Sequence, residues 1–405
     1  ELSKRLVGPK GPGRGWANRV FFSDDGSTAM EVGIKMGMKT YQKWHGLTNK
    51  DANEFDWIVC GQQDCYHGDT LGVMNVAEPS VFNEGQHPWY EPKGMFLSTP
   101  TVGYVDGELQ VSFETESIPI ESLEFVMDVS GRLDSKLYAR YVDSIEGIWN
   151  KVDHVQVEGS SKPCRIGSLV IEPVLMGAGG MKFVDPLWQR ALVDVAKSRR
   201  VPVVFDEVFS GFYRVGVRSC CEILGVDPDI AAYAKLLTGG LIPLSVTLAS
   251  EDVFESFLGD GKGQALLHGH SYTGNPMGCV SAIEALDVYE EVVGGREGEI
   301  RNLFDSAQVR SLSRLPLVQQ SFALGTVVAV TIAPDQSGGT GYAAASRTTP
   351  MVEALREEGV YARPLGNVIY IMASPLTDRR ECTRLCDILQ ETIETFGEEL
   401  MVAQQ

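Results

Sequence analysis

Positive charge is scarce in this chain of 405 residues: 35 lysines and arginines stand against 54 aspartates and glutamates, a formal net charge of −19. A protein that follows nucleic-acid phosphates needs a basic face, so this balance argues against nucleic-acid binding. Long apolar runs are lacking as well, and none reaches the roughly 18 to 20 residues of a membrane-spanning helix. The sequence therefore predicts neither a nucleic-acid-binding protein nor a membrane protein.

Cysteines are few and show no pairing pattern. The eight cysteines form no CxxC pair and lack the density of a disulfide scaffold, which favours free thiols in a reducing compartment. Cys382 and Cys386 lie one helical turn apart, but no histidine stands at metal-site spacing from them, so we expect core residues and no metal site. The chain opens on Glu1 without a signal or transit pattern, and we expect a fragment of a longer protein.

What the chain does have is glycine, 43 of 405 residues, and an alternation of short apolar runs with helical patterns. Residues 20–44 predict a strand, a turn and a helix. The apolar runs at 57–60, 167–171 and 201–205 fit strands of a parallel sheet that is covered on both faces. Residues 186–200 predict a helix between two of these strands, with Pro186 in its first turn and basic residues at its end.

The part of the chain after about residue 290 has patterns of its own. They predict strands at 326–332 and 368–372 and helices at 350–359 and 381–400. We therefore expect a large α/β domain, residues 1–290, and a compact α+β domain, residues 291–405.

The chain lacks the GxxxxGK[ST] loop of ATP-binding proteins, but it has another candidate for a phosphate site. Residues 23–28, Ser-Asp-Asp-Gly-Ser-Thr, lie between an expected strand and an expected helix. Free N–H groups at a helix start, with a glycine that allows close approach and hydroxyls beside it, suit a phosphate. Ordinary N-capping by Ser or Asp explains the same residues more simply, so the segment alone leaves both interpretations open.

Two carboxylates, Asp206 and Glu207, follow the apolar run at 201–205. Ligands of open α/β sheets bind at the carboxyl ends of the strands, so a carboxylate there can face a cofactor. A strand that simply ends in solvated acids is the alternative.

Lys235 follows an apolar run and precedes the pair Gly239-Gly240, an unusual setting for a residue that seeks water. Removal from water lowers the pKa of a lysine and makes it a nucleophile toward aldehydes. The alternative is a lysine whose stem covers apolar surface while its ammonium reaches water.

Three further segments combine aromatic, hydroxyl, glycine or arginine residues in expected turns: 66–70 (Tyr-His-Gly-Asp-Thr), 268–276 and Arg363-Pro364-Leu365-Gly366. Taken singly, each is more simply a structural turn. Arginine, however, is the side chain that binds a carboxylate with two parallel hydrogen bonds.

Together, a phosphate cradle, a strand-end carboxylate, a lysine 29 residues after Asp206, a tyrosine and a distant arginine are the parts of a pyridoxal phosphate site. At these positions the chain resembles the class III (subgroup II) aminotransferases, and among them the diaminononanoate synthases of biotin synthesis. The resemblance runs from Arg19 to about Phe396. Its marks are SDDGSTAMEVGIKM (23–36), YHGDT (66–70), IEPVLMGAGGM (171–181), FDEVFSGFYRVG (205–216), PDIAAYAKLLTGG (228–240), HGHSYTGNP (268–276) and RPLGNVIYIM (363–372).

The resemblance implies a fold and a role for single residues. The fold would be that of the type I pyridoxal-phosphate enzymes, a large domain with a mostly parallel seven-stranded sheet and a smaller C-terminal α+β domain. Lys235 and Asp206 would be catalytic, holding the aldehyde and the ring nitrogen of pyridoxal 5′-phosphate. The remaining roles would be phosphate binding by Gly26 and Ser27, ring stacking and substrate contact by Tyr66, completion of the phosphate cradle by the partner subunit's His270 and Ser271, substrate contact by Gly269, and carboxylate binding by Arg363.

The activity implied by the resemblance is transfer of an amino group to 8-amino-7-oxononanoate, with S-adenosylmethionine as donor, in a homodimer with shared active sites. The stretch 89–111, with the long helical insert after it, resembles the aminotransferase half of eukaryotic enzymes fused to dethiobiotin synthetase, and fusion or pairing with that activity is the partner that this resemblance suggests. The implied location is the mitochondrion in a eukaryote and the cytoplasm otherwise. Another class III aminotransferase acting on an ω-amine or ornithine, and a non-catalytic dimeric remnant, stay as alternatives. Family members carry a further N-terminal segment, and in bacterial relatives a proline tends to occupy the position of His270.

Overall fold

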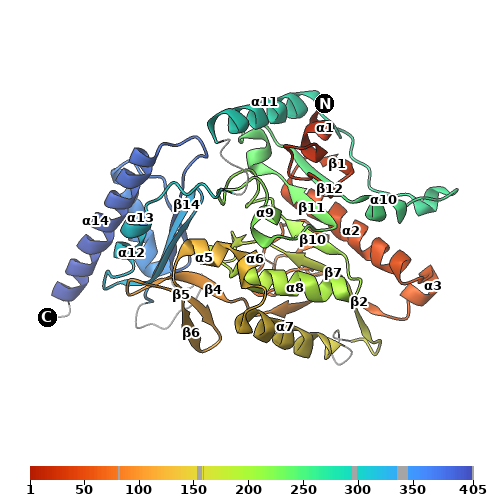
Figure 1. Ribbon diagram of the computed structural model, residues 1–405, viewed down its shortest axis with the longest axis horizontal. Helices are drawn as coiled ribbons and strands as arrows, with labels where there is room; N and C mark the ends of the chain where they lie inside the picture. Colours follow the sequence, from red (N-terminus) through yellow and green to blue (C-terminus); the bar gives the residue numbers. More distant parts are fainter. Residues whose placement is uncertain (81–82, 153–156, 158, 294–298, 335–344, 404–405) are drawn as a thin grey trace.

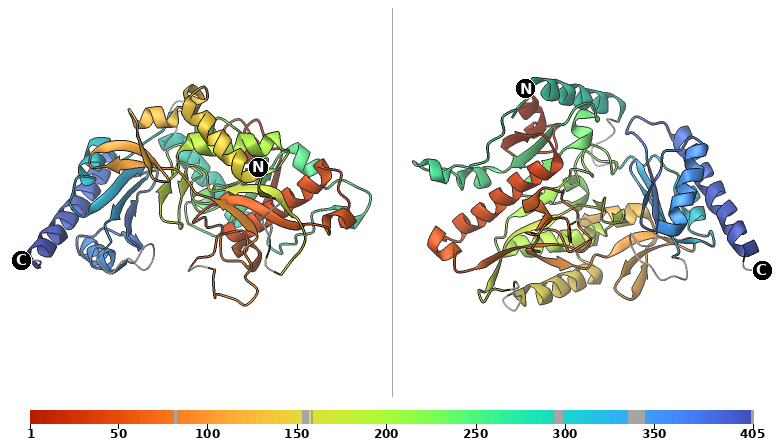
Figure 2. Two further views of the ribbon diagram at one scale, coloured as in Figure 1. Left: turned by 90° about the horizontal axis from the view of Figure 1, so that it is seen from below. Right: turned by 180° about the vertical axis from the view of Figure 1, so that it is seen from behind.

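The computed structural model describes the chain except residues 81–82, 153–156, 158, 294–298, 335–344 and 404–405. Figures 1 and 2 show two lobes side by side, each built on one sheet. The long helix α14 (Arg379–Ala403) lies along the outer flank of the second lobe, away from the first (Figure 1). Within the described residues, no helix combines the length and the apolar character that crossing a bilayer requires.

The first sheet has seven strands, and five neighbouring strands that extend to one of its edges run parallel. Across the sheet the order is β1 (Arg19–Ser23), β12 (Ser245–Ala249), β11 (Ile230–Tyr233), β10 (Val203–Asp206), β7 (Cys164–Ile171), β2 (Asp56–Gln62) and β3 (Gly94–Leu97). Only β12 runs antiparallel to both of its neighbours. The predicted mostly parallel seven-stranded sheet is confirmed, as are the strands expected at 57–60, 167–171 and 201–205.

The apolar sequence of β10 follows from its cover on both faces. Val204 packs in the cluster that contains α2 (Gly26–Trp44), whereas Val203 and Phe205 pack on the side of α8 (Pro186–Ser198). All four β10 residues are buried. Alternate residues of a strand point to opposite faces, so a strand between two helical layers has no position for a polar side chain until it ends.

The second sheet is antiparallel and combines distant parts of the chain. Its order is β15 (Arg363–Leu365), β16 (Val368–Met372), β14 (Val327–Ile332), β13 (Val318–Leu324), β4 (Thr101–Val105), β5 (Glu108–Phe113) and β6 (Glu116–Pro119). Three of these strands therefore come from before residue 290, the expected domain boundary. That division of the chain stays a prediction.

The remaining elements connect or cover the sheets. They are α1 (Leu2–Val7), α3 (Asn49–Ala52), α4 (Leu71–Met74), α5 (Leu123–Met127), α6 (Val129–Arg132), α7 (Lys136–Trp149), β8 (Leu175–Met176), β9 (Lys182–Phe183), α9 (Cys221–Leu224), η2 (Lys235–Thr238), α10 (Glu251–Glu255), η3 (Lys262–Gln264), α11 (Pro276–Val292), α12 (Ser306–Leu312) and α13 (Ala345–Glu357). Helix α13 begins before Pro350, where the sequence predicted its start. Proline marks a helix start only when its missing N–H falls in the first turn, and here it lies further inside.

Candidate active site

Four parallel strands end at the same edge of the first sheet, and each leads into a polar residue of one cavity. Tyr66 follows β2, Glu172 follows β7, Asp206 ends β10 and Lys235 follows β11. The cavity measures about 210 Å³, and its wall also includes Gly26 and Ser27 at the start of α2. Five residues predicted as site residues thus lie around one space, at the edge where open α/β sheets bind ligands.

The other predicted site residues lie outside this cavity within the single chain. His270 Nε2 is 3.2 Å from Asp24 Oδ1, next to the start of α2, while Gly269 and Ser271 are exposed. Arg363 is exposed on β15, where its charge acts on Tyr370 of the paired strand β16. Their roles stay predictions.

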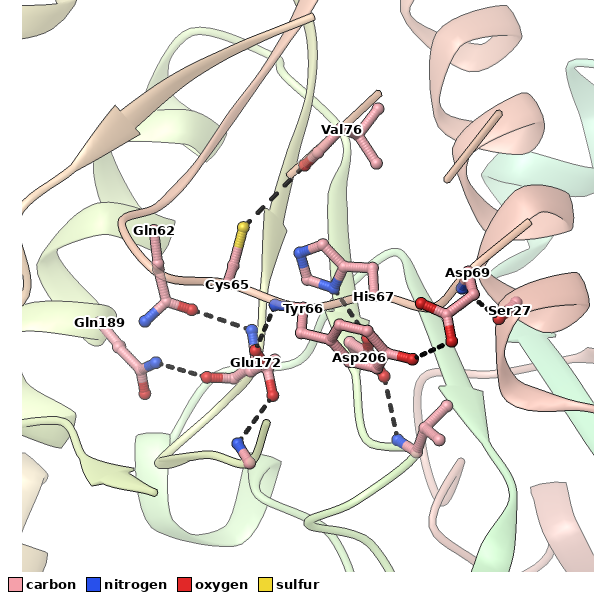
Figure 3. A network of polar contacts seen from close by, with 12 residues as sticks. Ser27, Gln62, Cys65, Tyr66, His67, Asp69, Val76, Glu172, Gln189 and Asp206 are labelled. Atoms are coloured by element: carbon pink, nitrogen blue, oxygen red, sulfur yellow. Dashed lines mark hydrogen bonds and ion pairs between the residues drawn. The ribbon is translucent and has the colours of Figure 1, made fainter. Parts of the chain in front are cut away.

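Asp206 is 5% exposed and held on both carboxylate oxygens. Oδ2 lies 2.7 Å from His67 Nδ1, and Oδ1 accepts a hydrogen bond from the Val208 N–H at 3.1 Å. Figure 3 shows Asp206 at the centre of this network, with His67 and Tyr66 beside it. The neighbouring Glu207 points away and accepts from Ser219 and Tyr233, as expected for successive residues at a strand end.

Lys235 begins η2 with a φ of 47°, a left-handed conformation that is rare outside glycine. Its side chain lines the cavity, is reached by solvent there, and places Nζ 5.2 Å from the centre of the Phe209 ring. Surrounding protein lowers the pKa of the Lys235 ammonium, although the nearby carboxylates of Asp206 and Glu172 oppose this shift. The expected apolar setting of the lysine is therefore only partial, because one side of the ammonium faces an open space.

The start of α2 has the form of an anion cradle. Asp25 Oδ1 accepts from the Thr28 N–H at 2.9 Å, which orders the first turn of the helix. A Cβ on Gly26 would lie 2.6 Å from Val208, and a Cβ on Gly68 would lie 1.9 Å from Ser27 Oγ. Glycine at both positions leaves room for these neighbouring side chains to pack at the start of the helix, and the helix N-terminus favours a negative group.

Sequence reasoning missed three groups around the cavity. His67 lies in the segment 66–70, but its partner Asp206 is 139 residues further along the chain. Glu172 is buried and accepts from the N–H groups of Tyr66 and Gly177, each at 2.9 Å, and burial raises its pKa to about 7. Arg214, eight residues after Asp206, bonds Thr326 Oγ1 at 2.7 Å and the Ala373 carbonyl at 2.8 Å.

Arg214 connects the two lobes beside the cavity. Its Nε is buried without a partner among the described residues, and burial lowers the pKa of its guanidinium to about 10. Its charge acts on Lys235, which places it close to the lysine. A cation between the sheets here adds to the attraction of the site for anionic ligands.

These residues fit pyridoxal phosphate. A helix start with glycine can hold a phosphate, a buried carboxylate can hold a protonated ring nitrogen, and a lysine with a lowered pKa faces both. The described residues contain no cluster of three or more His, Cys, Asp or Glu that could bind a metal ion.

Comparisons with known proteins agree with this geometry. The family "Aminotransferase class-III" matches residues 9–393. A bifunctional dethiobiotin synthetase/7,8-diamino-pelargonic acid aminotransferase of Oryza sativa subsp. japonica is 41% identical over 92% of this chain and 47% of its own length. The adenosylmethionine-8-amino-7-oxononanoate aminotransferase of Synechococcus elongatus is 30% identical over 87% of this chain and 71% of its own.

A solved structure has the same fold. The adenosylmethionine-8-amino-7-oxononanoate aminotransferase of Methanocaldococcus jannaschii superposes with a TM-score of 0.73 at 26% identity, covering 97% of this chain and 78% of that one. The chain spans about half the length of the bifunctional plant relatives, 47% in each case.

Proposed function

The chain belongs to the class III aminotransferases, and we propose from this that it transfers an amino group to 8-amino-7-oxononanoate, giving 7,8-diaminononanoate, with S-adenosylmethionine as donor. The observation that carries the proposal is the convergence of Lys235, Asp206 and the start of α2 on one cavity of about 210 Å³. The substrates in this proposal are inferred from the names of the relatives.

Pyridoxal phosphate, when bound, supplies an electron sink that makes the Cα proton of an amine substrate acidic. Gly26 and Ser27 would bind the phosphate with backbone N–H groups, and Tyr66 would stack on the ring. Asp206 would accept a hydrogen bond from the ring nitrogen and keep it protonated. Lys235 would hold the aldehyde group of the cofactor and would carry the proton to and from the substrate.

Arg363 binds the carboxylate of the keto-acid substrate in this proposal, and Gly269 lines the path to the cavity. Arg363 stands on β15 of the second lobe, and its exposure leaves the guanidinium free to meet a ligand. A planar guanidinium matches a carboxylate better than the point charge of a lysine.

A homodimer is the proposed form, because a large apolar surface flanks the segment that contains His270 and Ser271. Helix α11 and the turn before β12 border a hollow of about 660 Å³. Leu241 is 81% exposed, Met277 72% and Val280 58%. Soluble monomers rarely leave such a surface in water, so a second copy that covers it would also bring its own His270 and Ser271 toward the phosphate.

The plant and fungal relatives are fused to dethiobiotin synthetase, and the plant ones are described as mitochondrial. We propose that this chain likewise works with a dethiobiotin synthetase, because these relatives combine both activities in one protein, and in mitochondria if its source is eukaryotic.

A donor screen tests the function. The protein, loaded with pyridoxal phosphate, is given 8-amino-7-oxononanoate with S-adenosylmethionine, lysine, glutamate or ornithine, and diaminononanoate is measured by mass spectrometry. Production with S-adenosylmethionine supports the proposal. Turnover of ornithine or an ω-amine without 8-amino-7-oxononanoate would favour the second class III activity, and a protein that binds the cofactor without any turnover would favour a non-catalytic role.

A further inference from the structure

The His67 imidazole has one ring nitrogen bound, and the other is buried without a hydrogen-bond partner among the described residues. Nδ1 lies 2.7 Å from Asp206 Oδ2, whereas Nε2 makes no hydrogen bond within the described part of the chain. The side chain has no solvent exposure. An unpaired buried polar atom costs about 1 to 3 kcal/mol, so a ring held this way is expected to have a second contact.

The Cys65 thiol lies on the free side of this ring. It is buried, and Figure 3 shows its sulfur and the second ring nitrogen of His67 on the side of the ring away from Asp206. The thiol donates a long hydrogen bond, 4.0 Å, to the Val76 carbonyl, which uses the thiol proton and leaves the sulfur lone pairs available. A thiol sulfur can accept a hydrogen bond through its lone pairs.

We propose that Cys65 is a positioning residue whose sulfur pairs with His67 Nε2. The imidazole then donates on both sides, from Nδ1 to Asp206 and from Nε2 to Cys65. The orientation of the ring is then fixed, and the ring in turn holds the Asp206 side chain in the position that lines the cavity. The benefit for catalysis rests on the proposed function, whereas the Cys65–His67 pair itself does not.

The charges around His67 agree with a doubly protonated ring. Burial opposes a charged imidazole, but the Cys65 thiol and the Asp206 carboxylate outweigh it, and the pKa of His67 lies well above its ordinary value. Glu172, after β7, is the other ionisable group on which His67 acts: burial raises the pKa of this carboxyl, and the positive ring opposes that shift. Asp206 and Glu172 therefore face the ring from two strand ends, and Cys65 faces it from the loop after β2.

A cysteine that merely fills space would give a different result when it is removed. The full-length protein, with and without pyridoxal phosphate, is labelled with ¹³C at histidine Cε1 and titrated by NMR. The chain has only six histidines, and His67→Asn identifies the resonance of His67. Cys65→Ala should lower the pKa of His67 by about one unit, because the charged ring loses a hydrogen-bond acceptor.

Cys65→Ser, which keeps a side-chain atom that can accept a hydrogen bond, should give a His67 pKa between those of wild type and Cys65→Ala. Cys60→Ala is the matched control: Cys60 is equally buried on β2, and burial alone raises the pKa of its thiol. It should leave His67 unchanged. An unchanged His67 pKa in both Cys65 variants would overturn the proposal.

A second measurement separates this inference from the proposed function. In the loaded enzyme, Cys65→Ala should lower kcat severalfold with little change in KM. If the NMR shift is found in a protein that has no transaminase activity, the pairing stands and the function is wrong. If the protein is an active transaminase but the pKa of His67 is the same in wild type and in the Cys65 variants, the function stands and the pairing is wrong.

Discussion

Replacing Glu207 with glutamine should remove a pH-dependent loss of stability. Glu207 is fully buried behind the site, and the hydroxyls of Ser219 and Tyr233 donate to Oε1 at 2.5 and 2.8 Å. The Cys220 N–H donates to Oε2 at 2.8 Å. Burial raises the pKa of Glu207 to about 7 against these contacts, which act in the opposite direction. The carboxyl therefore stays protonated in the folded protein at pH values where it is ionised in the unfolded chain.

The difference between the pKa of Glu207 in the folded and in the unfolded protein determines the sign and the size of its effect on the free energy of unfolding. Below pH 4.5, both states hold the proton and the group leaves stability unaffected. As the pH rises from 4.5 to about 7, the unfolded chain loses the proton first, so the folded state is progressively destabilised. The pKa of Glu207 rises from 4.5 in the unfolded chain to about 7 in the folded protein. At roughly 1.4 kcal/mol per pKa unit, the free energy of unfolding falls by about 3 kcal/mol across this range. With an unfolding entropy of about 2 cal/mol/K per residue, this is about 3 to 4 °C in Tm for 405 residues.

Glutamine can satisfy the same partners without ionising. Its carbonyl can accept from the Cys220 N–H, while its NH₂ donates to the oxygens of Ser219 and Tyr233. Unfolding of the cofactor-free protein, followed by circular dichroism at pH 5 and pH 8, should therefore show equal stability at pH 5 and a more stable Glu207→Gln at pH 8. Glu222→Gln removes an equal charge from the exposed surface of α9 and should match wild type. A Glu207→Gln protein that lost as much stability as wild type between these pH values would refute the reasoning.

Four further outcomes are expected. Lys235→Ala should fold but lose turnover, and borohydride reduction of the loaded wild type should label Lys235, so a peptide map with another labelled lysine would contradict its role. Asp206→Ala should lower kcat by about a hundredfold or more, since it removes a buried charge at the ring nitrogen; near-normal turnover would exclude that contact. Arg363→Ala should raise KM for 8-amino-7-oxononanoate about ten- to a hundredfold, because it removes a charge-assisted bidentate contact, and the cofactor spectrum should be unchanged. Equal discrimination between the acid and its methyl ester by wild type and variant would show that Arg363 does not bind the carboxylate. Val280→Asp, on the exposed face of α11, should shift sedimentation toward a monomer, and an unaltered dimer would place the interface elsewhere.

The parallel sheet was predictable because its signal is local. Residues 203–205 carry only apolar side chains, and a strand covered on both faces leaves no other pattern. The positions of Lys235 and Asp206 at strand ends were predictable in the same way, since each stands at the end of an apolar run, whereas their roles stay predictions. His67 and Arg214 were not assigned roles, because their contacts join distant parts of the chain. His67 contacts Asp206 at another strand end, and Arg214 bonds residues of the other lobe. The start of α13 was misplaced because the local rule for proline competes with packing.

The strands β4–β6 were beyond any local pattern, since their partner β13 lies some 200 residues later and nothing near residue 104 indicates it. This pairing has a consequence for synthesis of the protein. Tyr104 of β4 meets Ser321 of β13, so 217 residues separate the two partners. At about 5 to 20 residues per second, a nascent chain carries the outer edge of β4 without its neighbour for roughly 10 to 40 s. An unpaired edge can join strands of other chains, so the aggregation risk of this protein is concentrated in that interval. A chaperone that covers residues 101–119 during translation should raise the yield of soluble protein more than one that acts after release.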